Sequence, residues 1–285
     1  METLVIDIGG TKTNVSFVDQ SGSGIEILSS EIFPTPLKPE QAIRQIQSIC
    51  EKNRKNPPFM SLSLPGVWDE SGVLIESFFL TNWLEYPFIE TLARALNIQN
   101  YTWETDVICA AIGEYNVLEM TNSKSMLYLN LGTGIGAALI KDGKPFRSGS
   151  ALTLRMQKLI LPIQDEFYSG IELISGGTLL EISGYDSIER LYGDCKIAKV
   201  EALDIISRAQ IQLSAWIINL FYLFAPDSII LGGGLTYDWG VLAEGAIDIV
   251  NEELESKLLI LPSKLKEMAS IYGAYINLLN EKSIK

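Results

Sequence analysis

The first apolar run of the chain covers residues 4–8 and is interrupted only by Asp7. Such a run predicts a strand in a sheet that is covered on both faces. Gly9 and Gly10 follow directly, and the chain returns as a second predicted strand over residues 14–18. A buried carboxylate needs a partner, and two glycines allow the backbone to turn tightly and to approach a ligand. The alternative is a tight hairpin in which the protein itself satisfies Asp7.

The rest of the chain alternates strand and helix patterns, which predicts an α/β protein. Strand patterns cover residues 25–33, 59–64 and 98–103, and a further strand from residue 228 runs into three glycines. Helical patterns cover residues 40–53, 89–96, 106–114, 199–224, 243–254 and 271–279. The longest of these places its apolar residues on one face, as expected of a helix that packs on a core.

A second stretch, residues 127–143, repeats the plan of the first. It has an apolar strand, a polar residue, a glycine turn, a second strand and an Asp-Gly turn. Asn130 falls where Asp7 does, and Gly132 falls where Gly9 does. Two glycine hairpins in register suggest two related half-sheets, each of which presents a phosphate-binding turn.

Both motifs resemble those of the ROK family of sugar kinases (repressors, open reading frames, kinases), within the actin, Hsp70 and hexokinase superfamily. Residues 7–12, Asp-Ile-Gly-Gly-Thr-Lys, are similar to its first phosphate motif, and residues 131–136, Leu-Gly-Thr-Gly-Ile-Gly, to its second. The resemblance covers nearly the whole chain. It implies two ribonuclease-H-like (actin-like ATPase) domains with a cleft between them. The small domain would hold residues 1–117 and 268–285, and the large domain residues 118–267.

The resemblance also implies an ATP-dependent, glucokinase-like enzyme that transfers the γ-phosphoryl group to a hexose hydroxyl, the 6-OH. Its catalytic base would be Asp106, although an aspartate that precedes a helix can equally be a plain N-cap. The residues that would bind ATP are Asp7, Gly9, Gly10, Thr11, Lys12, Gly132, Thr133, Gly134, Gly136, Gly232, Gly233 and Gly234. The sugar site would comprise Gly66, Asn82, Thr105, Asp106, Thr153 and Glu172. Asp7 would hold Mg²⁺ through water.

The sugar-binding residues depart from the family pattern in several places. Thr105 stands where the family has asparagine, Thr153 where it has glutamate, and Met156 where it has histidine. The cysteine-rich zinc motif is absent, as in a short branch of the family. Glu172 is the candidate replacement for a later sugar-binding glutamate, one residue out of register. An exposed glutamate in the first turn of a helix would give the same pattern.

Composition and charge further narrow the kinds of protein that this chain could be. A chain of 285 residues is long enough for two domains, and a net charge of −13 disfavours binding to nucleic acid and to anionic membranes. No signal-peptide pattern precedes the first strand, and the apolar segment 213–225 is too short to span a bilayer. The chain has no histidine and only three dispersed cysteines, Cys50, Cys109 and Cys195. We therefore expect reduced cysteines, a cytoplasmic protein and no zinc site.

Two other functions stay open. One is a catalytically weak or inactive ROK-fold protein that acts as a sugar- or nucleotide-responsive regulator. Thr105, Thr153 and Met156 favour it, whereas Asp7 and Asp106 argue against it. No helix-turn-helix precedes the first strand, which disfavours a DNA-binding repressor. The other is an Hsp70-type ATPase, for which the chain is too short. The expected partners are a small sugar and ATP, with a homodimer as one possible assembly.

Overall fold

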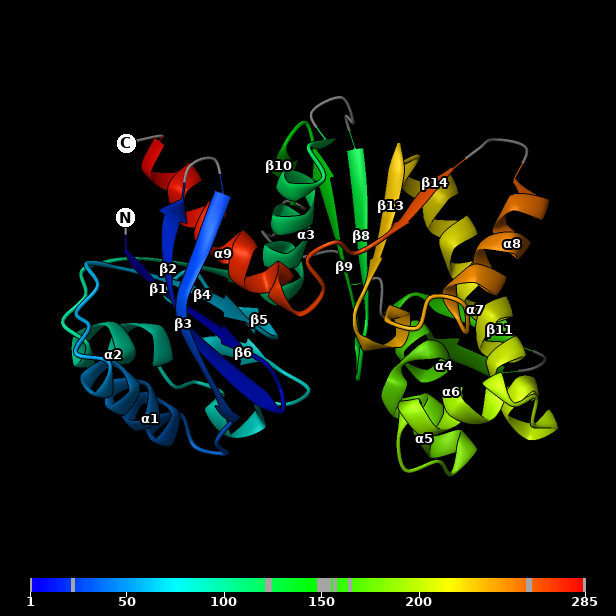
Figure 1. Ribbon diagram of the computed structural model, residues 1–285, viewed down its shortest axis with the longest axis horizontal. Coiled ribbons are helices and arrows are strands. Elements are labelled where there is room, and N and C mark those ends of the chain that lie inside the picture. The colour runs from blue at the N-terminus through cyan, green and yellow to red at the C-terminus, as the bar shows by residue number, and fades with distance from the viewer. Residues whose placement is uncertain are drawn as a thin grey trace. The chain divides into compact units, whose positions relative to one another are not determined.

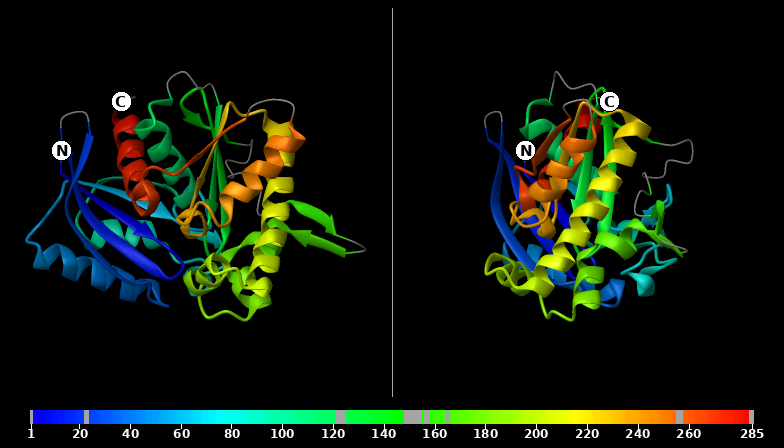
Figure 2. Two further views of the ribbon diagram at one scale, coloured as in Figure 1. Left: turned by 45° about the vertical axis from the view of Figure 1, so that its right-hand side comes forward. Right: turned by 90° about the vertical axis from the view of Figure 1, so that its right-hand side faces the viewer.

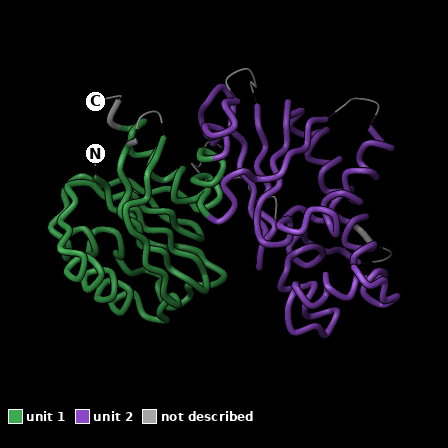
Figure 3. Tube along the Cα trace, viewed as in Figure 1, with its two compact units in different colours: residues 1–113, 268–285 green, residues 114–267 purple. Residues whose placement is uncertain are grey.

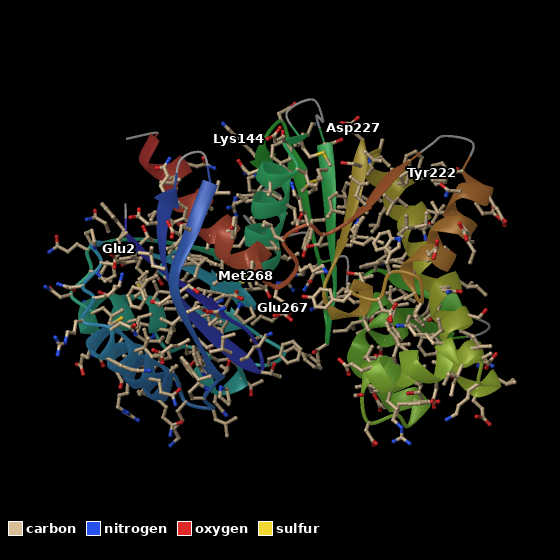
Figure 4. All side chains as sticks on the ribbon, in the orientation of Figure 1. Glu2, Lys144, Tyr222, Asp227, Glu267 and Met268 are labelled. Carbon is tan, nitrogen blue, oxygen red and sulfur yellow. The ribbon has the colours of Figure 1, made fainter. Side chains whose placement is uncertain are left out.

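The protein is described by a computed structural model that covers residues 2–21, 24–120, 125–147, 155, 158–163, 166–254 and 258–283. It divides into two compact units (Figure 3). Unit 1 comprises Met1–Gly113 and Met268–Lys285, and unit 2 comprises Glu114–Glu267. The first boundary therefore lies inside the helix α3 (Asp106–Val117), four residues before residue 117, where we expected it from the sequence. The chain returns to unit 1 between Glu267 and Met268, both of which are labelled in Figure 4.

Unit 1 is built on a five-stranded sheet in the order β3-β2-β1-β4-β7. Its strands are β1 (Thr3–Ile8), β2 (Lys12–Ser21), β3 (Gly24–Pro34), β4 (Phe59–Leu64) and β7 (Asn100–Thr105). The central strand β1 pairs antiparallel with β2 and parallel with β4. Strand β7 lies two residues later than the pattern over 98–103 predicted.

Helices cover both faces of this sheet, as the apolar run in β1 predicted (Figure 1). Leu4 and Ile6 belong to the core that includes α1 (Pro39–Lys52) and α2 (Phe88–Ala95). Val5, which points to the opposite face, packs with residues of α3 and of the closing helix α9 (Ala269–Ser283). Because side chains alternate along a strand, Asp7 lies on the same face as Val5, toward α3 and α9.

Unit 2 contains a second five-stranded sheet, in the order β10-β9-β8-β13-β14. Its strands are β8 (Ser125–Leu131), β9 (Ile135–Lys141), β10 (Lys144–Pro145), β13 (Ser228–Gly232) and β14 (Leu259–Pro262). The central strand β8 pairs antiparallel with β9 and parallel with β13. This arrangement repeats that of β1, β2 and β4, so the two related half-sheets predicted from the glycine hairpins are present.

The remaining elements of unit 2 are mostly helical. They are α4 (Gly170–Ile174), α5 (Gly176–Ser183), α6 (Ile188–Lys196), α7 (Val200–Phe224), α8 (Ala243–Glu253), and the 3-10 turns η4 (Gly234–Thr236) and η5 (Lys266–Met268). The final residue of η5, Met268, belongs to unit 1. A hairpin of β11 (Ile160–Ile163) and β12 (Glu166–Ser169) projects from this unit (Figure 2). Helix α7 buries the face predicted from its apolar spacing. None of the helices in the described ranges is long and apolar enough to cross a membrane.

Glu114 anchors the chain where it passes between the units. Its side chain in α3 is fully buried. It accepts hydrogen bonds from Ser263 Oγ (2.5 Å), Lys264 N (2.9 Å) and Leu265 N (2.8 Å). The first passage between the units starts at Glu114, and the second follows shortly after Leu265. The buried carboxylate of Glu114 therefore connects α3 with the segment 263–265, and the chain crosses between the units next to each of these segments.

We predict that Glu114→Ala lowers the free energy of unfolding by ~3 kcal/mol, because one buried and two partly buried donors lose their acceptor. Glu114→Gln should lose less, since its amide oxygen can still accept from Ser263 and Leu265. Urea denaturation of both variants measures the effect, with Glu253→Ala on the exposed face of α8 as the control. Equal stability of the Glu114→Ala and Glu253→Ala variants would contradict this role.

Candidate functional site

Four polar residues form a row across the sheet of unit 1. Asp7 on β1 lies opposite Asn14 on β2 and next to Ser63 on β4, and Ser63 lies next to Glu104 on β7. Residues in register on neighbouring strands point to the same face of a sheet. The row lies close to the carboxyl ends of the parallel strands β1, β4 and β7, where open α/β sheets commonly bind ligands.

The partner that the sequence required for Asp7 is Ser63. Its hydroxyl donates to Asp7 Oδ1 at 2.5 Å. Burial nevertheless raises the pKa of Asp7 to about 6, and the hydrogen bond from Ser63 and the charge of Lys12 only partly oppose this rise. Asp7 is thus held in place by the protein, yet its charge is poorly compensated.

Asp106 stands at the point where β7 ends and α3 begins. Its Oδ1 accepts a hydrogen bond from Val107 N at 2.8 Å, so the side chain does contact the helix start. Burial, followed by the negative charge of Asp7, raises the pKa of Asp106 to about 7. An exposed N-cap would titrate well below neutrality, whereas a carboxylate that titrates near pH 7 suits a general base. The preceding Thr105 Oγ1 is buried and has no hydrogen-bond partner among the described residues.

The turn between β1 and β2 is closed by a hydrogen bond from Gly9 N to Lys12 O (2.8 Å). A loop after β3 supports it: Thr35 N donates to Thr11 O (3.0 Å), and Thr35 Oγ1 donates to Gly9 O (2.8 Å). Gly10 must be glycine, because a Cβ there would lie 2.5 Å from Phe79 Cγ. Thr11 and Lys12 remain exposed at the tip.

The corresponding turn of unit 2 is one residue shorter. It is closed by Gly132 N donating to Gly134 O at 2.9 Å. Thr133 is exposed at its tip, whereas Gly136 lies within β9, opposite Asn130. Gly136 therefore serves the strand pairing and not the turn itself. A Cβ on Gly132 would meet only Gly134 O, at 3.9 Å, so packing alone does not require glycine at this position.

Two other glycine segments of unit 2 lie against this turn. The start of α5 lies against it, since Gly176 N donates to Gly132 O (2.8 Å) and Gly177 N to Thr133 O (3.2 Å). On the other side, Gly233 has a φ of +88°, and a Cβ there would lie 2.3 Å from Leu131 O. Gly232 likewise leaves no room, because a Cβ would lie 2.2 Å from the hydroxyl of Tyr128. Gly234, which begins η4, has open space around it.

Sequence reasoning missed that Gly176 and Gly177 support this turn. The signal was present as a Gly-Gly pair that opens a helix, because glycine allows close backbone approach, and a Cβ on Gly176 would lie 2.9 Å from Gly132 O. Sequence alone could not connect that pair to a turn more than forty residues earlier.

The predicted sugar-binding residues have different surroundings. Gly66 adopts a left-handed φ of +91°, and a Cβ there would lie 2.6 Å from Glu76 O. Asn82 is exposed in η1 (Thr81–Trp83). Glu172 accepts hydrogen bonds from Ser169 N (2.8 Å) and from Ser169 Oγ, which forms a capping box at the start of α4. The hydrogen bonds from Ser169 lower the pKa of Glu172. Glu172 thus has a structural role, and its sugar-binding role stays a prediction.

Thr153 and Met156 lie outside the described residues. Cys50 and Cys109 are buried free thiols, and Cys195 is partly buried. Within the described ranges, no group of three acidic or cysteine side chains is arranged to hold a metal ion. A divalent cation in unit 1 would therefore need ligands from a bound nucleotide and water beside Asp7.

Curated relatives match this chain along most of its length. The N-acetylmannosamine kinase of Vibrio cholerae (strain ATCC 39541) is 24% identical over 271 residues, which is 90% of each chain. A Bacillus subtilis (strain 168) protein, provisionally named a fructokinase, is 26% identical over 290 residues, which covers 95% of this chain and 93% of that protein.

Solved structures share the fold over the whole chain. The Lmo2764 protein from Listeria monocytogenes superposes with a TM-score of 0.86 at 21% identity, and covers 99% of this chain and 100% of its own. A ROK glucokinase from Streptomyces griseus in complex with glucose and AMPPNP superposes with a TM-score of 0.79 at 20% identity. It covers 96% of this chain and 98% of its own. A ROK transcriptional regulator, a homologue of the E. coli MLC protein, gives 0.83 at 15% identity, covering 98% of this chain and 78% of its own.

The fold is therefore the two-domain, actin-like ATPase fold, with an α/β unit of ribonuclease-H type in each half. A sequence model of the ROK family matches residues 3–156 of this chain, which is more than half of its length. This match includes both glycine hairpins and Asp106. The chain belongs to the ROK family.

Proposed function

We propose that the protein is an ATP-dependent sugar kinase that transfers the γ-phosphoryl group of ATP to the 6-OH of a hexose. The observation that carries this proposal is Asp106, a carboxylate at the end of β7 whose pKa is raised to about 7. It lies near Asp7, whose negative charge contributes to that shift, and in the unit that carries the first phosphate turn. The named relatives, which include an N-acetylmannosamine kinase, support the same class of reaction.

In this reaction the hydroxyl oxygen bonds to the γ-phosphorus, and the bond from that phosphorus to the β–γ bridging oxygen breaks. The proton of the hydroxyl passes to a carboxylate oxygen of Asp106. A positioned base of this kind contributes roughly 10²–10⁴-fold to the rate. Phosphoryl transfer otherwise depends on positioning and charge stabilisation.

Backbone groups of each glycine turn are suited to hold phosphate, because consecutive backbone N–H groups in glycine turns form anion-binding concavities. Gly9, Gly10 and Thr11 form the turn of unit 1, with Lys12 as a nearby cation. In unit 2, the turn at Gly132–Gly134 would act together with Gly232–Gly234. The start of α5 supports this turn through its hydrogen bonds to Gly132 O and Thr133 O.

Asp7 fits a role in binding Mg²⁺ that is coordinated mainly by phosphate oxygens and water. Burial leaves its charge poorly compensated, as its pKa of about 6 indicates, and a cation beside it would lower that pKa. Bound Mg²⁺ would neutralise the charge that develops on the transferred phosphoryl group. Ser63 holds the carboxylate in place for this contact.

For the acceptor sugar, the orphaned hydroxyl of Thr105 is the strongest support, because buried polar groups are rarely left without a partner. A sugar hydroxyl beside Asp106 would supply it. Gly66 and Asn82 would contribute from neighbouring loops. A coupled ADP assay over glucose, mannose, fructose, N-acetylglucosamine, N-acetylmannosamine and allose identifies the hexose.

A regulator that binds a sugar without phosphorylating it is the second candidate, since a ROK transcriptional regulator shares the fold at a TM-score of 0.83. Thr105 in place of asparagine is the residue that favours it. Stoichiometric ADP release with any sugar of the panel supports the kinase. Sugar binding by calorimetry without ADP release supports the regulator.

We predict that Asp106→Asn lowers turnover by at least ~10²-fold while ATP affinity changes little. Asparagine keeps the size of the side chain and can still accept from Val107 N, but it cannot take the proton. Wild-type kcat/KM should rise as the pH increases through about 7, the pKa of Asp106, and this rise should be lost in the variant. Full activity of Asp106→Asn on the best sugar would rule out Asp106 as the base.

The same substitution should stabilise the protein at high pH. The pKa of Asp106 is raised from 3.8 to about 7 in the folded state, so the folded form loses stability as pH rises from about 4 to 7. Asp106→Asn removes that loss and should gain ~4 kcal/mol at pH 8 and roughly a third of that at pH 5. Thermal melts at both pH values measure this.

Asp69→Asn is the control for these melts, because its expected change in stability has the opposite sign. Asp69 accepts hydrogen bonds from Val73 N and Ser71, which lower its pKa. Its substitution should therefore destabilise the protein at pH 8. An Asp106→Asn variant that is no more stable than wild type at pH 8 would contradict the raised pKa of Asp106, of which burial is the main cause.

We predict that Gly132→Val weakens ATP binding by more than ~10-fold, because a side chain would enter the space above the turn where the phosphates would bind. The fold should survive, since a Cβ at Gly132 has only one neighbour, at 3.9 Å. Gly193→Val is the matched control: it lies on α6, and a Cβ at this position would have no neighbouring atoms within 4 Å. Unchanged ATP affinity of Gly132→Val in calorimetry would contradict this site.

A further inference from the structure

Two phenylalanine side chains are exposed beside the phosphate turn of unit 1. Phe78 is 79% exposed and Phe79 is 41% exposed, and their ring centroids lie 5.1 Å apart in an edge-to-face arrangement. We refer to this pair as the aromatic shelf. Exposing two adjacent rings to water is unfavourable, and exposed apolar patches commonly mark binding sites.

The backbone that carries the shelf is fixed by local contacts. Ser77 Oγ accepts hydrogen bonds from Phe79 N (3.2 Å) and Leu80 N (2.9 Å). The preceding strand β6 (Leu74–Glu76) pairs with β5 (Val67–Trp68). Gly66, with its left-handed φ, lets this hairpin pack closely, since a Cβ there would lie 3.2 Å from Ser77 Cβ. The shelf is therefore held on an ordered support.

The shelf lies directly against the turn at Gly9 and Gly10. A Cβ on Gly10 would be 2.5 Å from Phe79 Cγ and 2.7 Å from Phe79 Cβ. After Leu80 the chain continues into η1, which carries Asn82. Trp83 Nε1 of η1 donates to Pro36 O (3.1 Å), in the loop whose Thr35 holds the same turn. The shelf thus contacts the phosphate turn and is followed closely in the chain by the segment of Asn82.

We propose that the aromatic shelf is a specificity subsite that selects acceptor sugars with an apolar substituent. This inference rests on the proposed kinase function, because an acceptor must lie beside the terminal phosphate that it attacks. A residue that touches Gly10 is then next to the acceptor. Phenylalanine has no polar atom for a sugar hydroxyl, so the shelf gains only from apolar contact.

The chemistry of the neighbouring residues points in the same direction. The hydroxyl of Thr105 and the amide of Asn82 would orient the hydroxyls of the ring. The shelf offers them no competing hydrogen bonds. An unsubstituted hexose would leave most of both phenylalanine rings in water, whereas an apolar group on the sugar would cover them.

The test compares methyl and phenyl glycosides of glucose and of mannose, which share a free 6-OH and differ only in the apolar group. Binding is measured by saturation-transfer NMR and calorimetry, and phosphorylation by ADP release. Wild type should bind the phenyl glycosides about tenfold more tightly than the methyl glycosides. Phe78→Ala should reduce that preference to about twofold or less, since one of the two rings is lost.

Phe79→Leu keeps an apolar contact with Gly10 and should retain part of the preference. Phe167→Ala is the matched control, because Phe167 on β12 is similarly exposed, at 76%, but belongs to unit 2. It should keep the full preference. ATP affinity should be unchanged in Phe78→Ala and Phe167→Ala, neither of which alters the contact with Gly10.

The proposed role of the aromatic shelf would be overturned by equal affinity of wild type for the methyl and phenyl glycosides, or by a full preference retained in Phe78→Ala. ADP release without any dependence on Phe78 would also overturn it, while leaving the kinase in place. Binding that depends on Phe78 without ADP release from any sugar would support the shelf and reject the kinase.

Discussion

A negative charge placed at the end of an apolar strand is the constraint on which much of unit 1 depends. Asp7 follows buried residues of β1 and faces α3 and α9. A buried carboxylate without partners is costly, and Ser63 on the neighbouring strand supplies a short hydrogen bond. Asp106 adds a second negative charge, and the repulsion from Asp7 contributes to its raised pKa. Two carboxylates that repel each other are poorly suited to stability alone, and such strain is typical of functional sites.

Glycine imposes the complementary constraint, which is close packing of backbone. Gly10 leaves room for Phe79, and Gly232 leaves room for the hydroxyl of Tyr128. Gly233 can approach Leu131 only because it has no side chain and takes a positive φ. These close contacts bring backbone N–H groups from distant segments to one place. Gly132 differs, since its neighbours would tolerate a side chain.

The two units use the same sheet order for different chemistry. In unit 1, the candidate site residues act through side chains: carboxylates at positions 7 and 106, the hydroxyl of Thr105 and the rings of the aromatic shelf. In unit 2, the candidates are mainly backbone groups, and two glycine segments lie around the turn at Gly132–Gly134. Under the proposed function, proton transfer and acceptor selection would depend on unit 1.

The sequence by itself determined the alternation of strands and helices, because apolar spacing reports which faces are buried. It also determined that the two hairpins follow the same plan, since turn residues act locally and Asp7 and Asn130 occupy matching places in them. Tertiary structure decided what depends on contacts distant in sequence. It brought Ser63 to Asp7, the start of α5 to Gly132, and Phe79 to Gly10. It also turned Glu172 into a helix cap and Glu114 into an anchor, because a carboxylate takes its role from the donors that folding places around it.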